Sequence, residues 1–136
     1  MPELNGKWQY RSFCPRVAAN EFRAQITAPW TPLSVMNLTT TDGKISGTAT
    51  PRPGAALNVR GSVTPPVPES ATGEPELLPE GIELVIDGLA GAVYNLRGFF
   101  TPGTDHIVGT VVAISNDLAG RPVGTSGPFI LFPDKA

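Results

Sequence analysis

Cysteine and histidine are scarce in this chain, and their scarcity excludes several kinds of site. Among 136 residues there is one cysteine, Cys14, and one histidine, His106. A single thiol forms no internal disulfide, which fits a reducing cytoplasm. One thiol and one imidazole also fall short of the ligand set of a structural zinc ion. We therefore expect a cytoplasmic protein without a metal, in which Cys14 is a buried thiol and His106 a solvated loop residue.

Clusters of basic charge and long apolar runs are also missing. Ten lysine and arginine residues stand against twelve aspartate and glutamate residues, which gives a net charge of −2. The basic residues are scattered, so there is no footprint for nucleic acid or for anionic lipid. No stretch approaches the roughly 18 to 20 continuous apolar residues of a membrane span. We expect neither nucleic acid nor a membrane as a partner.

Motifs that hold nucleotides or activate a serine are absent as well. The glycine-rich turn at 88–91, GLAG, is not followed by a helix or by a Lys-Ser/Thr pair that would cradle phosphate. The segment at 124–128, GTSGP, lacks the strand-to-helix context of a nucleophile elbow. The sequence therefore predicts no cofactor.

Glycine, proline and β-forming residues are what the chain has in quantity. Fifteen glycines and fifteen prolines occur at short intervals and leave little room for helix. Asp42-Gly43 suits a tight hairpin, and 51–54, 88–91 and 101–105 have similar turn chemistry. The runs between these breaks are rich in β-branched and aromatic residues and predict strands at 7–13, 22–27, 34–40, 44–50, 56–64, 82–87, 92–101, 106–116 and 127–132.

Consecutive hairpins of this kind predict a closed barrel. Gly47, Gly61, Gly98 and Gly109 fall inside strands, where glycine permits the sharp coiling that closure needs. Closure also removes the exposed edges of short strands. We predict an all-β fold, a single antiparallel up-and-down β-barrel of about eight or nine strands that occupies residues 1–136. The segment at 64–81, with five prolines and four glutamates, is expected to be a long solvated loop.

Two short motifs are similar to those of a known group of barrels. The N-terminal Leu4-Asn5-Gly6-Lys7-Trp8 resembles the start of the first strand in avidins, and its Gly-x-Trp part is shared with lipocalin-like calycins. The segment at 42–50, DGKISGTAT, is similar to an avidin hairpin. The resemblance implies a calycin-like barrel in which Trp8 closes one end. It does not extend to biotin binding, because nothing after Trp30 matches the later tryptophans of the avidin site.

Strand alternation indicates which side chains face the interior. In the first strand Trp8, Tyr10, Ser12 and Cys14 share one face, and in the seventh Tyr94, Leu96, Gly98 and Phe100 do. An eight-stranded barrel is just wide enough to be filled by its own side chains or to hold one small ligand. Buried tyrosine hydroxyls need partners, which favours a pocket. The residues predicted to contact a ligand are Trp8, Tyr10, Trp30, Met36, Tyr94, Arg97 and Phe100.

Three functions follow from this interior. The first is a barrel that binds a small, largely apolar molecule. The second is a cofactor-independent cyclase or isomerase of the allene oxide cyclase-like or natural-product type, which would accelerate its reaction by orienting one substrate. The third is a structural or interaction module with a filled barrel. The segment at 106–116 is apolar on both faces, and contact between subunits of a homo-oligomer is one way to cover its outer face.

Overall fold

Nine strands make up the described part of this protein. The computed structural model describes residues 3–17, 24–30, 33–52, 54–66 and 79–134, with the backbone alone for 15–17 and 24–28. No helix occurs in these ranges, so none there is long and apolar enough to cross a membrane. The strands are β1 (Gly6–Val17), β2 (Ala24–Pro29), β3 (Ser34–Thr41), β4 (Lys44–Pro51), β5 (Leu57–Thr64), β6 (Gly81–Leu89), β7 (Ala92–Phe100), β8 (Ile107–Ser115) and β9 (Ser126–Pro133).

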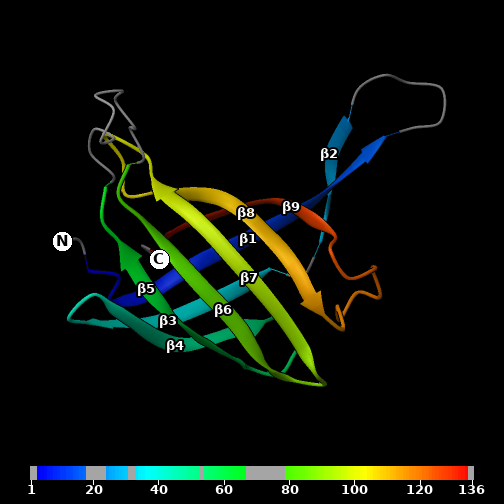
Figure 1. Cartoon of the computed structure of the whole chain (residues 1–136), viewed down its shortest axis with the longest axis horizontal. Helices are drawn as coiled ribbons and strands as arrows, with labels where there is room; N and C mark the ends of the chain where they lie inside the picture. The colour runs from blue at the N-terminus through cyan, green and yellow to red at the C-terminus, as the bar shows by residue number, and fades with distance from the viewer. Residues whose placement is uncertain (1–2, 18–23, 31–32, 53, 67–78, 135–136) are drawn as a thin grey trace, which may run out of the picture.

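Eight of these strands close into an antiparallel up-and-down barrel. Each strand from β3 to β8 pairs with the next one in the chain, and β1 pairs with both β3 and β9. The predicted fold class is therefore confirmed. The strand β2 pairs only with the second half of β1, from Phe13 to Val17, so the β1–β2 hairpin projects beyond the barrel (Figure 1).

Two tight turns confirm the hairpins that were predicted from sequence. Asp42 and Gly43 have φ values of 51° and 77°, and Ala90 and Gly91 have φ values of 53° and 75°. Positive φ at both central residues is the geometry of a two-residue turn whose twist matches that of the flanking strands. These turns join β3 to β4 and β6 to β7.

Alternation along the strands places side chains as predicted. Trp8, Tyr10, Ser12 and Cys14 on β1 are all buried, at 7% exposure or less. On β8 the outer side chains of Val108 and Ile114 are each 43% exposed in the single chain. A homo-oligomer that covers this outer face stays a prediction.

The barrel is packed densely at one end and sparsely at the other. Leu4 is fully buried, and its amide donates a hydrogen bond of 2.9 Å to Oγ1 of Thr40, near the end of β3 and the start of β4. The largest fully buried side chains are Leu4, Met36, Ile45, Ile82, Leu84, Ile107 and Leu131, of which Leu4, Ile45, Ile82, Ile107 and Leu131 gather at this end. Toward the other end the inner side chains of β1, β3 and β4 are small, namely Ser12, Ser34 and Ala49.

Glycine lets neighbouring strands approach closely within the wall. A Cβ at Gly109 would overlap the carbonyl oxygen of Arg97, and one at Gly61 would overlap that of Glu83. Any other residue at these two positions would push the strands apart, so glycine supports the coiling of the sheet. The predicted loop at 64–81 lies for its greater part outside the described residues.

Candidate ligand-binding site

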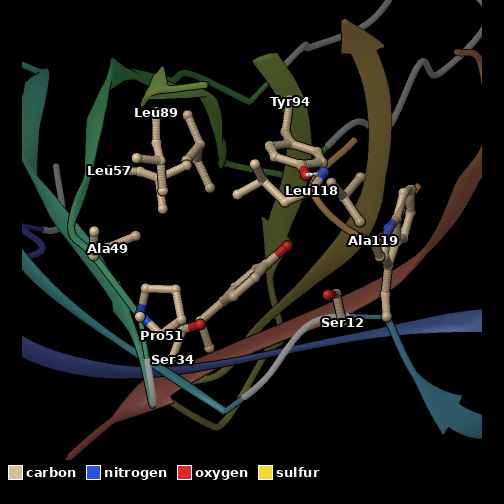
Figure 2. Close-up of a pocket in the computed structure, with 15 residues that line it drawn as sticks. Ser12, Ser34, Ala49, Pro51, Leu57, Leu89, Tyr94, Leu118 and Ala119 are labelled. Atoms are coloured by element: carbon tan, nitrogen blue, oxygen red, sulfur yellow. Dashed lines mark hydrogen bonds between the residues drawn. The ribbon is translucent and has the colours of Figure 1, made fainter. Parts of the chain in front are cut away.

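A cavity of about 270 Å³ lies inside the sparsely packed end of the barrel (Figure 2). Figure 2 shows Ala49, Leu57 and Pro51 on one side of it and Tyr94 and Leu118 on the other. The cavity is lined by Tyr10, Ser12, Trp30, Ser34, Ala49, Pro51, Gly54, Ala55, Leu57, Ile86, Leu89, Tyr94, Val111, Leu118 and Ala119. Because Gly54, Ala55, Leu118 and Ala119 are exposed, they form the rim of its opening.

Strand register explains why a cavity forms at this end. Tyr10 on β1 is paired with Ser34 on β3, and Ser34 is paired in turn with Pro51 on β4. Small side chains on adjacent strands leave space that the large side chains of the packed end do not reach. The ring of Tyr10 lies beside that of Phe129, with ring centroids 5.9 Å apart.

Few polar groups line the cavity wall. Tyr10 and Ser12 are two residues apart on β1, point to the same side and are joined by a hydrogen bond. Burial raises the pKa of the Tyr10 hydroxyl well above its usual value, and the hydrogen bond with Ser12 offsets only part of that rise. Tyr10 is therefore a neutral hydroxyl that can exchange hydrogen bonds with a ligand.

Tyr94 and Trp30 are held in place by a buried carboxylate, that of Asp117. The hydroxyl of Tyr94 donates a 2.7 Å hydrogen bond to Oδ1 of Asp117 and accepts one of 2.8 Å from the amide of Leu118. The indole Nε1 of Trp30 lies 3.2 Å from Oδ1 and 3.1 Å from Oδ2. The network therefore fastens the loop at 116–125 to β7 and to the end of β2.

Backbone amides complete the coordination of the Asp117 carboxylate. The amide of Ala119 donates to Oδ1 over 3.3 Å and the amide of Arg121 to Oδ2 over 3.0 Å. Burial would raise the pKa of Asp117, but the hydrogen bonds from Tyr94, Arg121, Ala119 and Trp30 together lower it below its usual value. Asp117 is thus ionised at neutral pH although its side chain is buried.

The Tyr94–Asp117 hydrogen bond, which lowers the pKa of Asp117, raises the pKa of Tyr94. Burial and the adjacent Asp117 carboxylate raise the pKa of Tyr94 to about 12, although the hydrogen bond from the Leu118 amide lowers it. A tyrosinate beside Asp117 would bring two negative charges together, so the hydroxyl keeps its proton. Tyr94 consequently presents its ring to the cavity, while its hydroxyl is engaged by the loop.

Three of the predicted ligand-contacting residues are brought together, and four are not. Tyr10, Trp30 and Tyr94 line the cavity. Trp8 and Met36 are buried in the core and do not line the cavity, and Phe100, at the packed end of β7, is partly buried against that core.

Arg97, also predicted to contact a ligand, lies on the outer face of the barrel. It follows the inward-facing Leu96 on β7, and successive residues of a strand point to opposite faces. Its guanidinium forms an ion pair with Glu83 and lies over the ring of Phe99, 5.2 Å from the ring centroid. The structure does not bring Arg97 into the cavity.

Asp117 is the residue that sequence reasoning missed. It lies in a loop after β8, and Asn116-Asp117 at the end of an apolar strand is a typical turn sequence. An aspartate whose carboxylate accepts amides two and four residues later is a local turn motif, which Asn-Asp predicts in part. Its contacts with Trp30 and Tyr94 span 87 and 23 residues, and no local pattern reveals them.

The remaining reactive side chains lie apart from the cavity. Cys14 is buried near the start of the β1–β2 pairing, as expected of a structural thiol. His106 is exposed, with its ring 5.7 Å from that of Phe132. Within the described ranges no group of three or more His, Cys, Asp or Glu side chains is arranged to hold a metal ion.

Comparison with protein-family models, with curated proteins and with solved structures finds no match for this chain. The fold and the cavity therefore define it as an eight-stranded up-and-down β-barrel with an internal pocket.

Proposed function

We propose that this barrel binds one small, largely apolar molecule in the cavity of its sparsely packed end. The observation that carries this proposal is the composition of the wall. Leu57, Ile86 and Val111 supply apolar surface, and the hydroxyl of Tyr10 supplies a polar contact. Ligand pockets in proteins usually combine an apolar lining with a few placed polar groups.

The size of the cavity limits the ligand. A volume of about 270 Å³ is just below the roughly 300 to 1,000 Å³ of pockets that hold drug-sized molecules. The ligand is therefore smaller than most drugs, with one or two rings or a short branched chain. It enters past Leu118 and Ala119, where the wall is exposed.

Binding of a neutral apolar dye tests this proposal. 1-Naphthylamine, a two-ring dye whose emission shifts to shorter wavelength in apolar surroundings, should bind the folded protein with one-to-one stoichiometry, because one barrel offers one such cavity. Ala49→Phe should abolish the signal, because Ala49 lines the cavity and the larger ring would occupy it.

Phenylalanine at the preceding residue is the matched control. Thr48 is partly exposed, and its side chain points outward, so Thr48→Phe should leave dye binding unchanged. Absence of binding to the unsubstituted chain, or equal binding by the two variants, would overturn the proposal.

A further inference from the structure

Among the residues that the structure describes, no cationic side chain lies within ion-pair distance of Asp117. Its carboxylate accepts hydrogen bonds from four groups, the indole of Trp30, the hydroxyl of Tyr94 and the amides of Ala119 and Arg121, all of them neutral. Across the described part of the chain, no lysine, arginine or histidine forms an ion pair with it. At 6% exposure, solvent does little to screen this charge.

Aromatic rings lie between this carboxylate and the cavity. Trp30 and Tyr94 both line the cavity and meet edge to face, with ring centroids 6.3 Å apart and an interplanar angle of 84°. Each donates its polar hydrogen to Asp117, which draws the proton away from the ring system and leaves the ring richer in electrons. Ring faces carry a negative quadrupole, so they attract a cation, most strongly in the case of tryptophan.

The lining residues contain no cationic side chain that would balance the charge of an anion. None of the fifteen is lysine, arginine or histidine. A carboxylate ligand would be buried without a cationic partner and near the charge of Asp117, both of which disfavour its binding. Fatty acids and other apolar anions are therefore poor ligands for this wall.

We propose that the ligand is a small organic cation, an amine or quaternary ammonium group on an apolar body, whose charge lies against Trp30 and Tyr94 on the side of Asp117. This inference rests on the proposed binding function and names the chemical class of the ligand. The apolar body packs on Leu57, Ile86 and Val111. The aromatic wall and the buried carboxylate replace part of the hydration that the cation loses.

Three probes with one heavy-atom skeleton and different charge test the inference. Benzyltrimethylammonium is a cation, 2,2-dimethylpropylbenzene is its neutral counterpart, and phenylmethanesulfonate is an anion of similar shape. Each would be titrated into the full chain, with binding followed by nuclear magnetic resonance shifts. The cation should bind about tenfold more tightly than the neutral probe, in keeping with a desolvated cation–π contact, and the anion should bind most weakly.

Two variants, Asp117→Asn and Trp30→Phe, test whether the preference for the cation arises at Asp117 and the rings beside it. Asp117→Asn removes the charge and should bring the cation-to-neutral ratio close to one. The control Asp87→Asn removes a carboxylate that is paired with Arg60 on the outer face, so it should leave the ratio unchanged. Trp30→Phe keeps a ring but weakens the cation–π contact, and it should lower the ratio even if Asp117→Asn does not fold.

The outcomes separate this inference from the proposed function. Equal or tighter binding of the neutral probe would overturn the inference and leave the function standing, since a small apolar molecule still binds. A cation preference that Asp117→Asn and Trp30→Phe both leave unchanged would also overturn it. Failure of all three probes and of 1-naphthylamine would overturn both.

Discussion

The hydroxyl of Tyr94 and the carboxylate of Asp117 lie 2.7 Å apart, on β7 and on the loop that follows β8. Through this contact the loop at 116–125 becomes part of the barrel mouth, with Leu118 and Ala119 on the cavity wall. The same carboxylate binds the indole of Trp30 at the end of β2. One buried charge therefore organises the open end of the barrel.

Removal of the Asp117 carboxylate should destabilise the protein. Asp117→Ala leaves the donors of Trp30 and Tyr94 without their acceptor, and an unsatisfied buried donor costs about 1 to 3 kcal/mol. Urea denaturation should show a loss of at least that size. Asp87→Ala removes a partly exposed ion pair and should cost no more than about 1 kcal/mol. Equal losses for the two variants would contradict a central role for Asp117.

Loss of the two tyrosine hydroxyls should have different consequences. Tyr94→Phe removes the donor to Asp117 and the acceptor for the Leu118 amide, so it should lower the free energy of unfolding by about 1 to 3 kcal/mol. Tyr10→Phe should affect stability less and weaken binding of any ligand that hydrogen-bonds to the cavity. Denaturation and dye titration of both variants would reveal this, and a reversed pattern would show that the roles are assigned wrongly.

Tyrosine ionisation should be suppressed in the folded protein. The chain has only two tyrosines, Tyr10 and Tyr94, and the pKa of each is raised by burial. The tyrosinate absorbance of the native protein should therefore stay low through pH 10, where the urea-unfolded chain titrates.

This suppression makes stability depend on alkaline pH. Because the folded-state pKa values are raised, both tyrosines contribute fully to the free energy of unfolding below about pH 10. This contribution is lost as the pH rises further. Unfolding should become easier from pH 10 toward pH 12, the folded-state value of Tyr94. A native chain whose tyrosines titrate normally at pH 10 would mean that they are accessible to water.

Acid should weaken the hydrogen-bond network of Asp117 at the open end of the barrel. The pKa of Asp117 is lowered in the folded state, so its contribution is present above about pH 4, the unfolded value, and is lost as the pH falls through the lower folded value. The stability difference between the unsubstituted chain and Asp117→Asn should be constant from pH 7 to pH 5 and shrink below pH 4. A stability difference between the two proteins that persists at pH 2 would mean that Asp117 stabilises the fold through packing and not through its charge.

Trp8 should contribute to stability and not to binding. Its side chain is buried in the core, away from the cavity, so Trp8→Ala should cost about 3 to 5 kcal/mol. The indole Nε1 has no hydrogen-bond partner among the described residues, so Trp8→Phe should cost less because it removes only part of the packed volume. An unchanged melting temperature for Trp8→Ala would contradict the structural role.

Local chemistry by itself determined the strands and their inner faces. Asp42-Gly43 predicts a tight hairpin because glycine takes positive φ, and the observed turn has that geometry. Alternation places Trp8, Tyr10 and Tyr94 inside because the side-chain period of a strand is two. The ligand-contact set in the sequence prediction nevertheless included Arg97, which the same alternation assigns to the outer face.

Tertiary structure alone decided which inner residues share a cavity. Strand register sets Ser34 beside Tyr10 and Pro51, and this pairing depends on contacts between strands that no single segment encodes. The burial of Asp117 likewise depends on Trp30 and Tyr94, which reach it from distant parts of the chain. The sequence thus determined the barrel and its inner surface, while the packing of distant strands and one loop decided where that surface stays open.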